Sequence, residues 1–144
     1  MSETARWLKT IDDSKLVIAF KHFGDMVNVW LRPNGSWCYG IVNSDTTTVN
    51  VYPLLLQRVS YKGRAKGILL ASRHGIGWSS CRLQLPDSYK EYDEYSFKRG
   101  LRIAMGRLLT GSNVTVPIYL QQAITELEDR RNRYFQLNNS VVSH

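Results

Sequence analysis

Cysteine is scarce in this sequence, and its scarcity excludes two classes of small domain. Of the 144 residues only Cys38 and Cys81 are cysteines, and they stand far apart in the chain. Structural zinc sites use closely spaced pairs of cysteine and histidine, and disulfide-rich domains use a framework of several cysteines. We therefore expect two reduced, half-buried thiols, and we predict no bound metal and no cofactor.

Long apolar runs are also missing. No stretch of about 18 uncharged apolar residues occurs, which is the length that a membrane-spanning helix needs. The segment from Met1 to Lys15 has no basic start followed by an apolar stretch, so it does not fit a secretory signal peptide. These absences predict a soluble, cytoplasmic protein with no membrane partner.

Histidine is scarce too, which argues against most acid-base and nucleophilic enzymes. The three histidines are His22, His74 and His144, and none stands in the spacing of a paired catalytic or metal-binding motif. His74 lies in a loop pattern between Arg73 and Gly75, where it can contact a phosphate or act as an acid. One loop histidine does not define an active site, so we predict no catalytic residue and a protein that is not an enzyme.

Two fragments resemble parts of enzyme motifs without completing them. The acidic cluster from Asp87 to Glu94 lacks the close Glu-x-Lys spacing of divalent-metal nucleases. We interpret it as a solvated segment that neutralises the adjacent basic helix or its N-terminal dipole. The pair Gly75-x-Gly77 lacks the third glycine and the lysine of a phosphate-binding loop.

Positive charge is what the sequence has in excess, and it is confined to the middle of the chain. The formal net charge is +7, from 19 Lys and Arg against 12 Asp and Glu. Residues 1–52 and 111–144 are each neutral, whereas residues 53–110 contain eleven cations and four anions. No Asp or Glu occurs from Thr46 to Pro86. Such a segment projects a positive potential over about one Debye length, ~8 Å at physiological salt.

A polyanion is the partner that this charge distribution favours, and we predict DNA or RNA binding without a preference between them. The alternative interpretation is ordinary solubilising charge on a basic domain. The residues predicted to contact phosphates are Arg58, Lys62, Arg64, Lys66, Arg73 and Arg82, with Lys98, Arg99 and Arg102 on the outer face of a helix.

Alternating and β-branched residues predict an antiparallel sheet in the first half of the chain. Strands are expected at residues 16–23, 27–31, 37–42 and 46–52. The sequence Pro33-Asn34-Gly35-Ser36 predicts a tight turn, because proline presets φ and Asn-Gly tolerates positive φ. Pro53 is expected to interrupt the sheet, and residues 54–61 fit either a helical turn or a strand. We expect Trp30, Trp37 and Tyr39 to fill the core of the sheet.

The second half of the chain changes from a strand pattern to a helical one. Residues 62–67 are expected to form a basic loop, and residues 68–72 and 80–85 two strands joined by residues 73–78. Phe97, Leu101, Ala104 and Leu108 then form one helical stripe, in a helix capped by Asp93 or Ser96. A last helix is expected from about Val116 to Phe135, with Leu120, Ala123, Ile124, Leu127 and Tyr134 on its buried side.

Together these patterns predict an α+β fold. We expect an antiparallel sheet of five to seven strands packed against two C-terminal helices. Residues 1–137 are expected to form a single domain that starts with a short helix at 2–9, and residues 138–144 a frayed tail.

Aromatic residues are abundant and partly interleaved with the charges. The chain has four Trp, eight Tyr and four Phe. Tyr89, Tyr92 and Tyr95 are spaced by three beside the acidic cluster, and Trp78 follows the basic segment. Exposed rings beside cations serve base stacking or protein recognition. We predict these four residues as a partner-binding set.

One stretch resembles a helix of small bacteriophage and plasmid proteins. It runs from Phe97 to Leu109 (FKRGLRIAMGRLL) and is preceded by an acidic turn, as in those proteins. The resemblance implies a phage-type accessory protein that acts on host nucleic-acid or defence machinery, in the host cytoplasm if phage-encoded. It transfers no catalytic residue, and it does not extend to the sheet half.

Two functions from different classes follow. The first is a non-enzymatic nucleic-acid-binding accessory protein that contacts phosphates through a basic patch. The second is a phage inhibitor that binds an acidic surface of a host enzyme or defence complex. The oligomeric state does not follow from the sequence.

Overall fold

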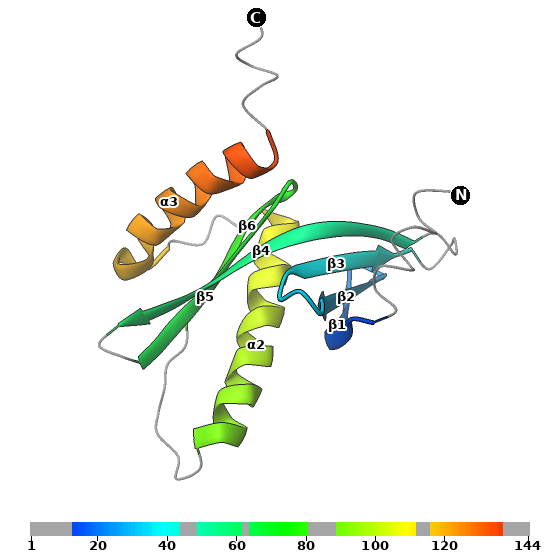
Figure 1. Ribbon diagram of the computed structural model, residues 1–144, viewed down its shortest axis with the longest axis horizontal. Coiled ribbons are helices and arrows are strands. Elements are labelled where there is room, and N and C mark those ends of the chain that lie inside the picture. The colour runs from blue at the N-terminus through cyan, green and yellow to red at the C-terminus, as the bar shows by residue number, and fades with distance from the viewer. Residues whose placement is uncertain (1–12, 44–48, 62–63, 81–88, 112–115, 137–144) are drawn as a thin grey trace, which may run out of the picture. The chain divides into compact units, whose positions relative to one another are not determined.

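The computed structural model describes residues 13–43, 49–61, 64–80, 89–111 and 116–136 (Figure 1). The predictions of an N-terminal helix at 2–9 and a frayed tail at 138–144 lie outside the described residues. So do Cys81 and the predicted contacts Lys62 and Arg82.

Six antiparallel strands, in the order of the chain, and two C-terminal helices make up the fold, which confirms the α+β prediction (Figure 1). The strands are β1 Lys15–His22, β2 Asp25–Leu31, β3 Trp37–Val42, β4 Val49–Tyr61, β5 Arg64–Ser72 and β6 Gly75–Ser80. The helices are α2 Tyr89–Thr110 and α3 Ile118–Tyr134. The chain divides into two compact units, residues 1–55 and 56–144, and β4 runs through the boundary between them.

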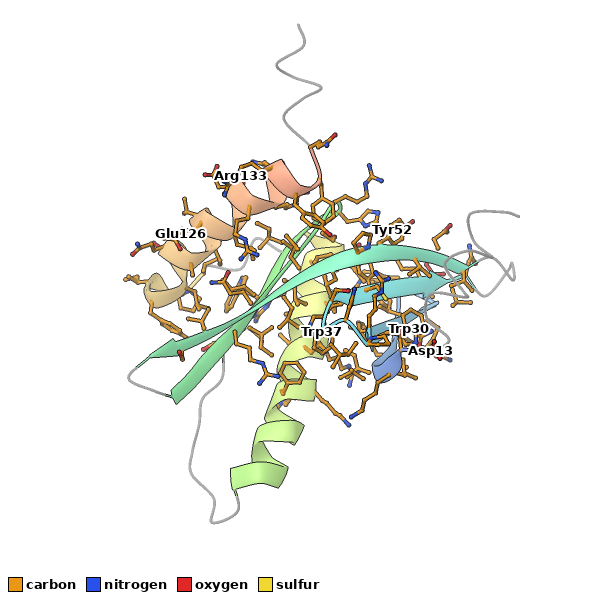
Figure 2. All side chains as sticks on the ribbon, in the orientation of Figure 1. Asp13, Trp30, Trp37, Tyr52, Glu126 and Arg133 are labelled. Atoms are coloured by element: carbon orange, nitrogen blue, oxygen red, sulfur yellow. The ribbon has the colours of Figure 1, made fainter. Side chains whose placement is uncertain are left out.

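The first unit is a meander with buried side chains on both faces of its strands. Val29 pairs with Tyr39, and Tyr39 pairs with Tyr52, so the three side chains share a face. Val29 and Tyr39 are completely buried, and the Tyr39 and Tyr52 rings lie 5.4 Å apart between centroids. Trp30 and Trp37 project from β2 and β3 and are only half-buried (Figure 2).

The turns of this unit have the backbone conformations that their residue types favour. Asn34 Oδ1 accepts hydrogen bonds from the Ser36 N–H (3.0 Å) and the Ser36 hydroxyl (2.6 Å), and Gly35 has φ +87°, as the Pro-Asn-Gly-Ser pattern predicts. The β1–β2 connection is shorter than expected. Strand β1 ends at His22, because Phe23 and Gly24 both take positive φ and form the turn.

Cys38 is more deeply placed than the half-buried thiol that the sequence suggests. Its side chain is completely buried in β3. Burial raises the pKa of the Cys38 thiol, and the nearby Arg32 charge offsets part of this effect.

The prediction that Pro53 interrupts the sheet is wrong. Strand β4 continues through Pro53, which pairs opposite Cys38, and residues 54–61 are strand rather than a helical turn. An antiparallel ladder uses the N–H of only every second residue toward a given neighbour, so a strand can accommodate one proline.

In the second unit, the residue bounds of strands β5 and β6 differ from the predicted bounds. Arg64 to Gly67, expected in a loop, belong to β5, and Gly75 to Ser80 form β6. Only Arg73 and His74 connect the two strands. The glycines of this segment suggest a loop, but they stand in a strand because a helix packs against them.

Helices α2 and α3 cover opposite faces of this hairpin. A Cβ at Gly77 would meet the Ala104 backbone of α2, whereas a Cβ at Gly67 points toward Leu120 of α3. Gly77 pairs with Leu70 and Gly67 pairs with Ser80, positions that alternate between the two faces. The central residues of β5 are accordingly buried whichever way they point.

The two helices bury most of the predicted stripes. Leu101, Ala104 and Leu108 of α2 are buried as predicted, although α2 begins at Tyr89, ahead of the expected caps. In α3, Leu120 and Leu127 are buried and Ala123 and Ile124 are half-buried. Tyr134 is a correction, because it is 61% exposed at the end of the helix.

Candidate nucleic-acid interface

The predicted phosphate contacts with described side chains all belong to the second unit. They are exposed in every case: Arg58 on β4, Arg73 in the β5–β6 turn, and Lys98, Arg99 and Arg102 on α2. Arg64 and Lys66 belong to β5, but their side chains lie outside the described residues.

The cations of α2 gather on the helix surface away from its packed stripe. Lys98 and Arg102 are separated by four residues and so lie one above the other, with Arg99 beside them. Leu101 and Leu108, at the opposite phase of the helix, are buried. We call Lys98, Arg99 and Arg102 the cationic face of α2. The helix thus separates an apolar side from a charged side, as its period of 3.6 residues dictates.

A contact between β4 and α2 brings a strand cation to this helix. The Arg58 guanidinium lies 4.2 Å from the centre of the Phe97 ring, within the range of a cation–π interaction. Phe97 immediately precedes Lys98. Phe97 belongs to the packed stripe of α2, so this contact brings Arg58 to the apolar side of the helix, in the same turn as Lys98.

Trp78 is not an exposed ring, which corrects the expectation for this residue. It is 8% exposed, and the Arg107 guanidinium lies over its indole at 3.9 Å. Arg107 Nη1 also donates a hydrogen bond to the Trp78 carbonyl (2.8 Å). Because β6 is the last strand in the order, this arginine covers part of the sheet edge and does not join the cationic face.

For the other predicted partner-binding rings, the structure gives the backbone position in α2 only. Tyr89, Tyr92 and Tyr95 lie on the first turns of α2, and their spacing of three puts them on neighbouring positions of one helix side. Their side chains lie outside the described part of the chain, so the predicted role in partner binding stays a prediction.

The β5–β6 turn gathers a second group of cations, in which Arg73 and His74 were expected from the sequence and Arg131 was not. Arg131 of α3 donates from Nε to the Ser72 carbonyl (2.5 Å) and from Nη2 to the Arg73 carbonyl (3.1 Å). The His74 N–H donates to Ser72 Oγ (3.0 Å). Partial burial lowers the pKa of His74, and the Arg73 and Arg131 charges lower it further.

No local pattern in the sequence points to Arg131. It is one of three arginines in a helix whose charges sum to zero with Glu126, Glu128 and Asp129. Only the packing of α3 against β5 brings it to a turn far away in the chain.

Among the described residues, no three His, Cys, Asp or Glu side chains group closely enough to hold a metal ion. Within those residues, no helix has the length and apolar character needed to cross a membrane.

Compared with protein-family models, curated proteins and solved structures, the chain matches none of them.

Proposed function

We propose that the protein binds nucleic acid through the cationic face of α2, with Arg58 as a neighbouring contact. The observation that carries this proposal is that Lys98, Arg99 and Arg102 are all exposed on α2, while the contact of Arg58 with Phe97 places a further cation at the same turn of the helix. In this proposal the phosphates of DNA or RNA are contacted, and base edges are not read.

The surrounding charge supports the same partner. No Asp or Glu occurs from Tyr95 to Thr125, and the acids nearest to the cationic face along the chain are those of the cluster that ends at Glu94, one turn before Lys98. Arginine donors suit the planar recognition of phosphate oxygens, and they keep their charge at all physiological pH values. A surface of this kind raises the local concentration of a polyanion before any specific contact forms.

The salt dependence of binding tests this function. Three to four phosphate contacts on duplex DNA predict a slope of about −3 for the logarithm of the binding constant against the logarithm of salt concentration. Fluorescence anisotropy with a labelled duplex, a single-stranded DNA and an RNA, each from 50 to about 300 mM salt, measures it. Affinity that does not change with salt, or no binding to any of the three, contradicts the proposal.

A charge-matched pair of variants locates the surface. The triple variant Lys98→Gln, Arg99→Gln, Arg102→Gln is expected to lose at least tenfold in affinity and to flatten the slope by about 2 to 3. The control Lys15→Gln, Lys21→Gln, Arg133→Gln removes the same charge from exposed positions elsewhere. Equal losses in the two variants mean that only net charge matters, and the α2 surface is then the wrong one.

A second function is favoured by one observation on α2 itself. Ile103 is 40% exposed next to Arg102, and an apolar side chain among cations is typical of a protein contact. We propose as the alternative that α2 docks on an acidic surface of a host enzyme or defence complex, as an accessory protein of phage type would.

Nuclease digestion separates the two functions. Partners that are captured from lysate and lost after nuclease treatment favour nucleic-acid binding, whereas partners that persist favour the protein contact. Ile103→Ser is expected to weaken only the protein contact, because it removes apolar area and leaves the cations in place.

A further inference from the structure

We propose that the β5–β6 turn is a phosphate-binding site formed by Arg73, His74 and Arg131. This site uses a turn and a helix other than α2, so it does not depend on the function proposed above. Arg73 and His74 are the two residues that connect the strands, Arg131 of α3 bonds the backbone of this turn, and both arginine charges act on His74.

Arg131 is held in place before any ligand arrives. A guanidinium has five N–H donors, and the hydrogen bonds of Arg131 to the Ser72 and Arg73 carbonyls use two of them. Within the described residues, the other three N–H groups donate to no protein acceptor. A cation fixed by its own scaffold loses little side-chain entropy when it binds an anion. The carbonyl contacts thus anchor the guanidinium at the turn.

His74 supplies the responsive part of the site. Arg73 faces it from the turn and Arg131 from α3, and both charges oppose its protonation. Helix α2 approaches the turn with its backbone, because a Cβ at Gly75 would lie 3.1 Å from the Leu108 carbonyl. An anion bound between the two guanidinium groups would offset their charges, and the imidazole would then become a third cationic donor.

Phosphate is the anion that this arrangement favours. Two guanidinium groups and an imidazole can together offer more donors than the two oxygens of a carboxylate use, and a tetrahedral oxyanion has more oxygens to accept them. The group can belong to a free phosphate or to a nucleic-acid backbone, and the two sources share this chemistry.

The test follows the His74 Cε1–H resonance by NMR at constant ionic strength in chloride. Inorganic phosphate and a short oligothymidylate are titrated separately, and sodium acetate serves as the control anion. A saturable shift with a rise in the His74 pKa is expected for phosphate groups, and little change for acetate. A response to both phosphate probes, to inorganic phosphate alone or to the oligonucleotide alone supports the site and identifies the source.

Three single variants assign the response. Arg73→Gln and Arg131→Gln are each expected to weaken the phosphate response roughly threefold, as the loss of one exposed charged contact does. Arg133→Gln, on the same helix and exposed (Figure 2), is expected to leave it unchanged. If Arg131→Gln unfolds, Arg73→Gln alone decides, because the Arg73 side chain is exposed.

Two results would overturn the site: no saturable shift with either phosphate probe, or the same response from Arg73→Gln as from Arg133→Gln. The α2 triple variant keeps the two proposals apart. It is expected to lose nucleic-acid affinity and to retain the full response of His74 to inorganic phosphate.

Discussion

At the scale of single residues, Gly77 determines how closely α2 approaches the sheet. A Cβ at this position would lie 1.9 Å from the Ala104 carbonyl oxygen, which is a backbone atom and cannot rotate away. Gly77 does not have positive φ, so it is required for space and not for backbone conformation. The pair Gly75-x-Gly77, a fragment of a phosphate-loop pattern in the sequence, is therefore part of a helix-packing surface.

Alanine substitutions at two glycines test this role. Gly77→Ala is expected to lower the free energy of unfolding by about 3 kcal/mol, because α2 must move away from β6. Gly106→Ala is the matched control: it lies in α2, and a Cβ there would meet nothing within 4 Å. That variant is expected to gain about 0.5 to 1 kcal/mol from helix propensity. Urea unfolding measures both, and equal effects would contradict the packing role of Gly77.

The lowered pKa of His74 makes the stability of the fold depend on pH. Because its folded pKa lies below the unfolded value of about 6.5, the unfolded chain binds more protons in the window between the two values. The contribution of His74 is fully present above pH ~6.5 and is lost as the pH falls through that window toward the folded pKa.

Replacing His74 is expected to reduce the pH dependence of the free energy of unfolding. In phosphate-free buffers, His74→Gln should lose less unfolding free energy than wild type between pH 7.5 and about 5.5. His22→Gln controls for the loss of a histidine elsewhere in the chain. Identical pH profiles for wild type and His74→Gln would show that the turn exerts no such effect.

At the scale of elements, β5 and β6 form a hairpin enclosed by helices on both faces. Ile68, Leu69, Leu70 and Ala71 are all buried, which a strand with one solvated face cannot achieve. The period-two pattern that marks the first unit is therefore absent here. This is why the sequence predicts the strand at 68–72 but takes residues 75–78 of β6 for a connection; residues 81–85 of the second predicted strand lie outside the described part of the chain.

The open edge of β6 is covered by a side chain of α2. Arg107 stacks on Trp78 and bonds its carbonyl, so the strand presents fewer free backbone groups at the edge. The same contact accounts for the burial of Trp78.

Replacing Arg107 by methionine distinguishes the stabilisation from its apolar stem from the stabilisation by its charged guanidinium. Arg107→Met keeps most of the apolar stem over the indole and is expected to lose about 1 to 2 kcal/mol, from the hydrogen bond and the cation–π contact. Arg99→Met, on the exposed cationic face, should change stability by less than about 0.5 kcal/mol. Urea denaturation compares the two, and a loss no greater than that of Arg99→Met would mean that the edge contact is not stabilising.

At the scale of the whole molecule, one strand belongs to both compact units. Strand β4 pairs with β3 up to Leu54 and continues to Tyr61, across the boundary after Leu55. The boundary between the units thus falls inside a strand and not inside a loop. An unfolding experiment can therefore test the prediction, made from the sequence, that the chain forms a single domain.

Unfolding probes placed in each unit test that prediction. In Trp78→Phe, tryptophan fluorescence reports residues 1–55, which hold Trp7, Trp30 and Trp37, whereas circular dichroism at 222 nm is dominated by α2 and α3. A single domain predicts coincident urea transitions by the two probes. Two separate midpoints would instead show two domains that unfold independently.

The sequence by itself determined the features that depend on near neighbours in the chain. The Pro33–Ser36 turn, the alternating strands of the first unit and the buried stripe of α2 follow from φ preferences and from periods of 2 and 3.6 residues. The location of the excess charge in residues 53–110 is likewise a property of the chain alone.

Only the tertiary structure decided which residues meet across long separations. The strand at Gly75 to Ser80, the burial of Trp78 and the bonds of Arg131 to the β5–β6 turn all depend on helices that come later in the chain. Taken with its sequence neighbours alone, a glycine indicates a flexible segment and an arginine indicates a solvated charge. Their roles here come from the backbone or ring that packing places against them, which no local pattern specifies.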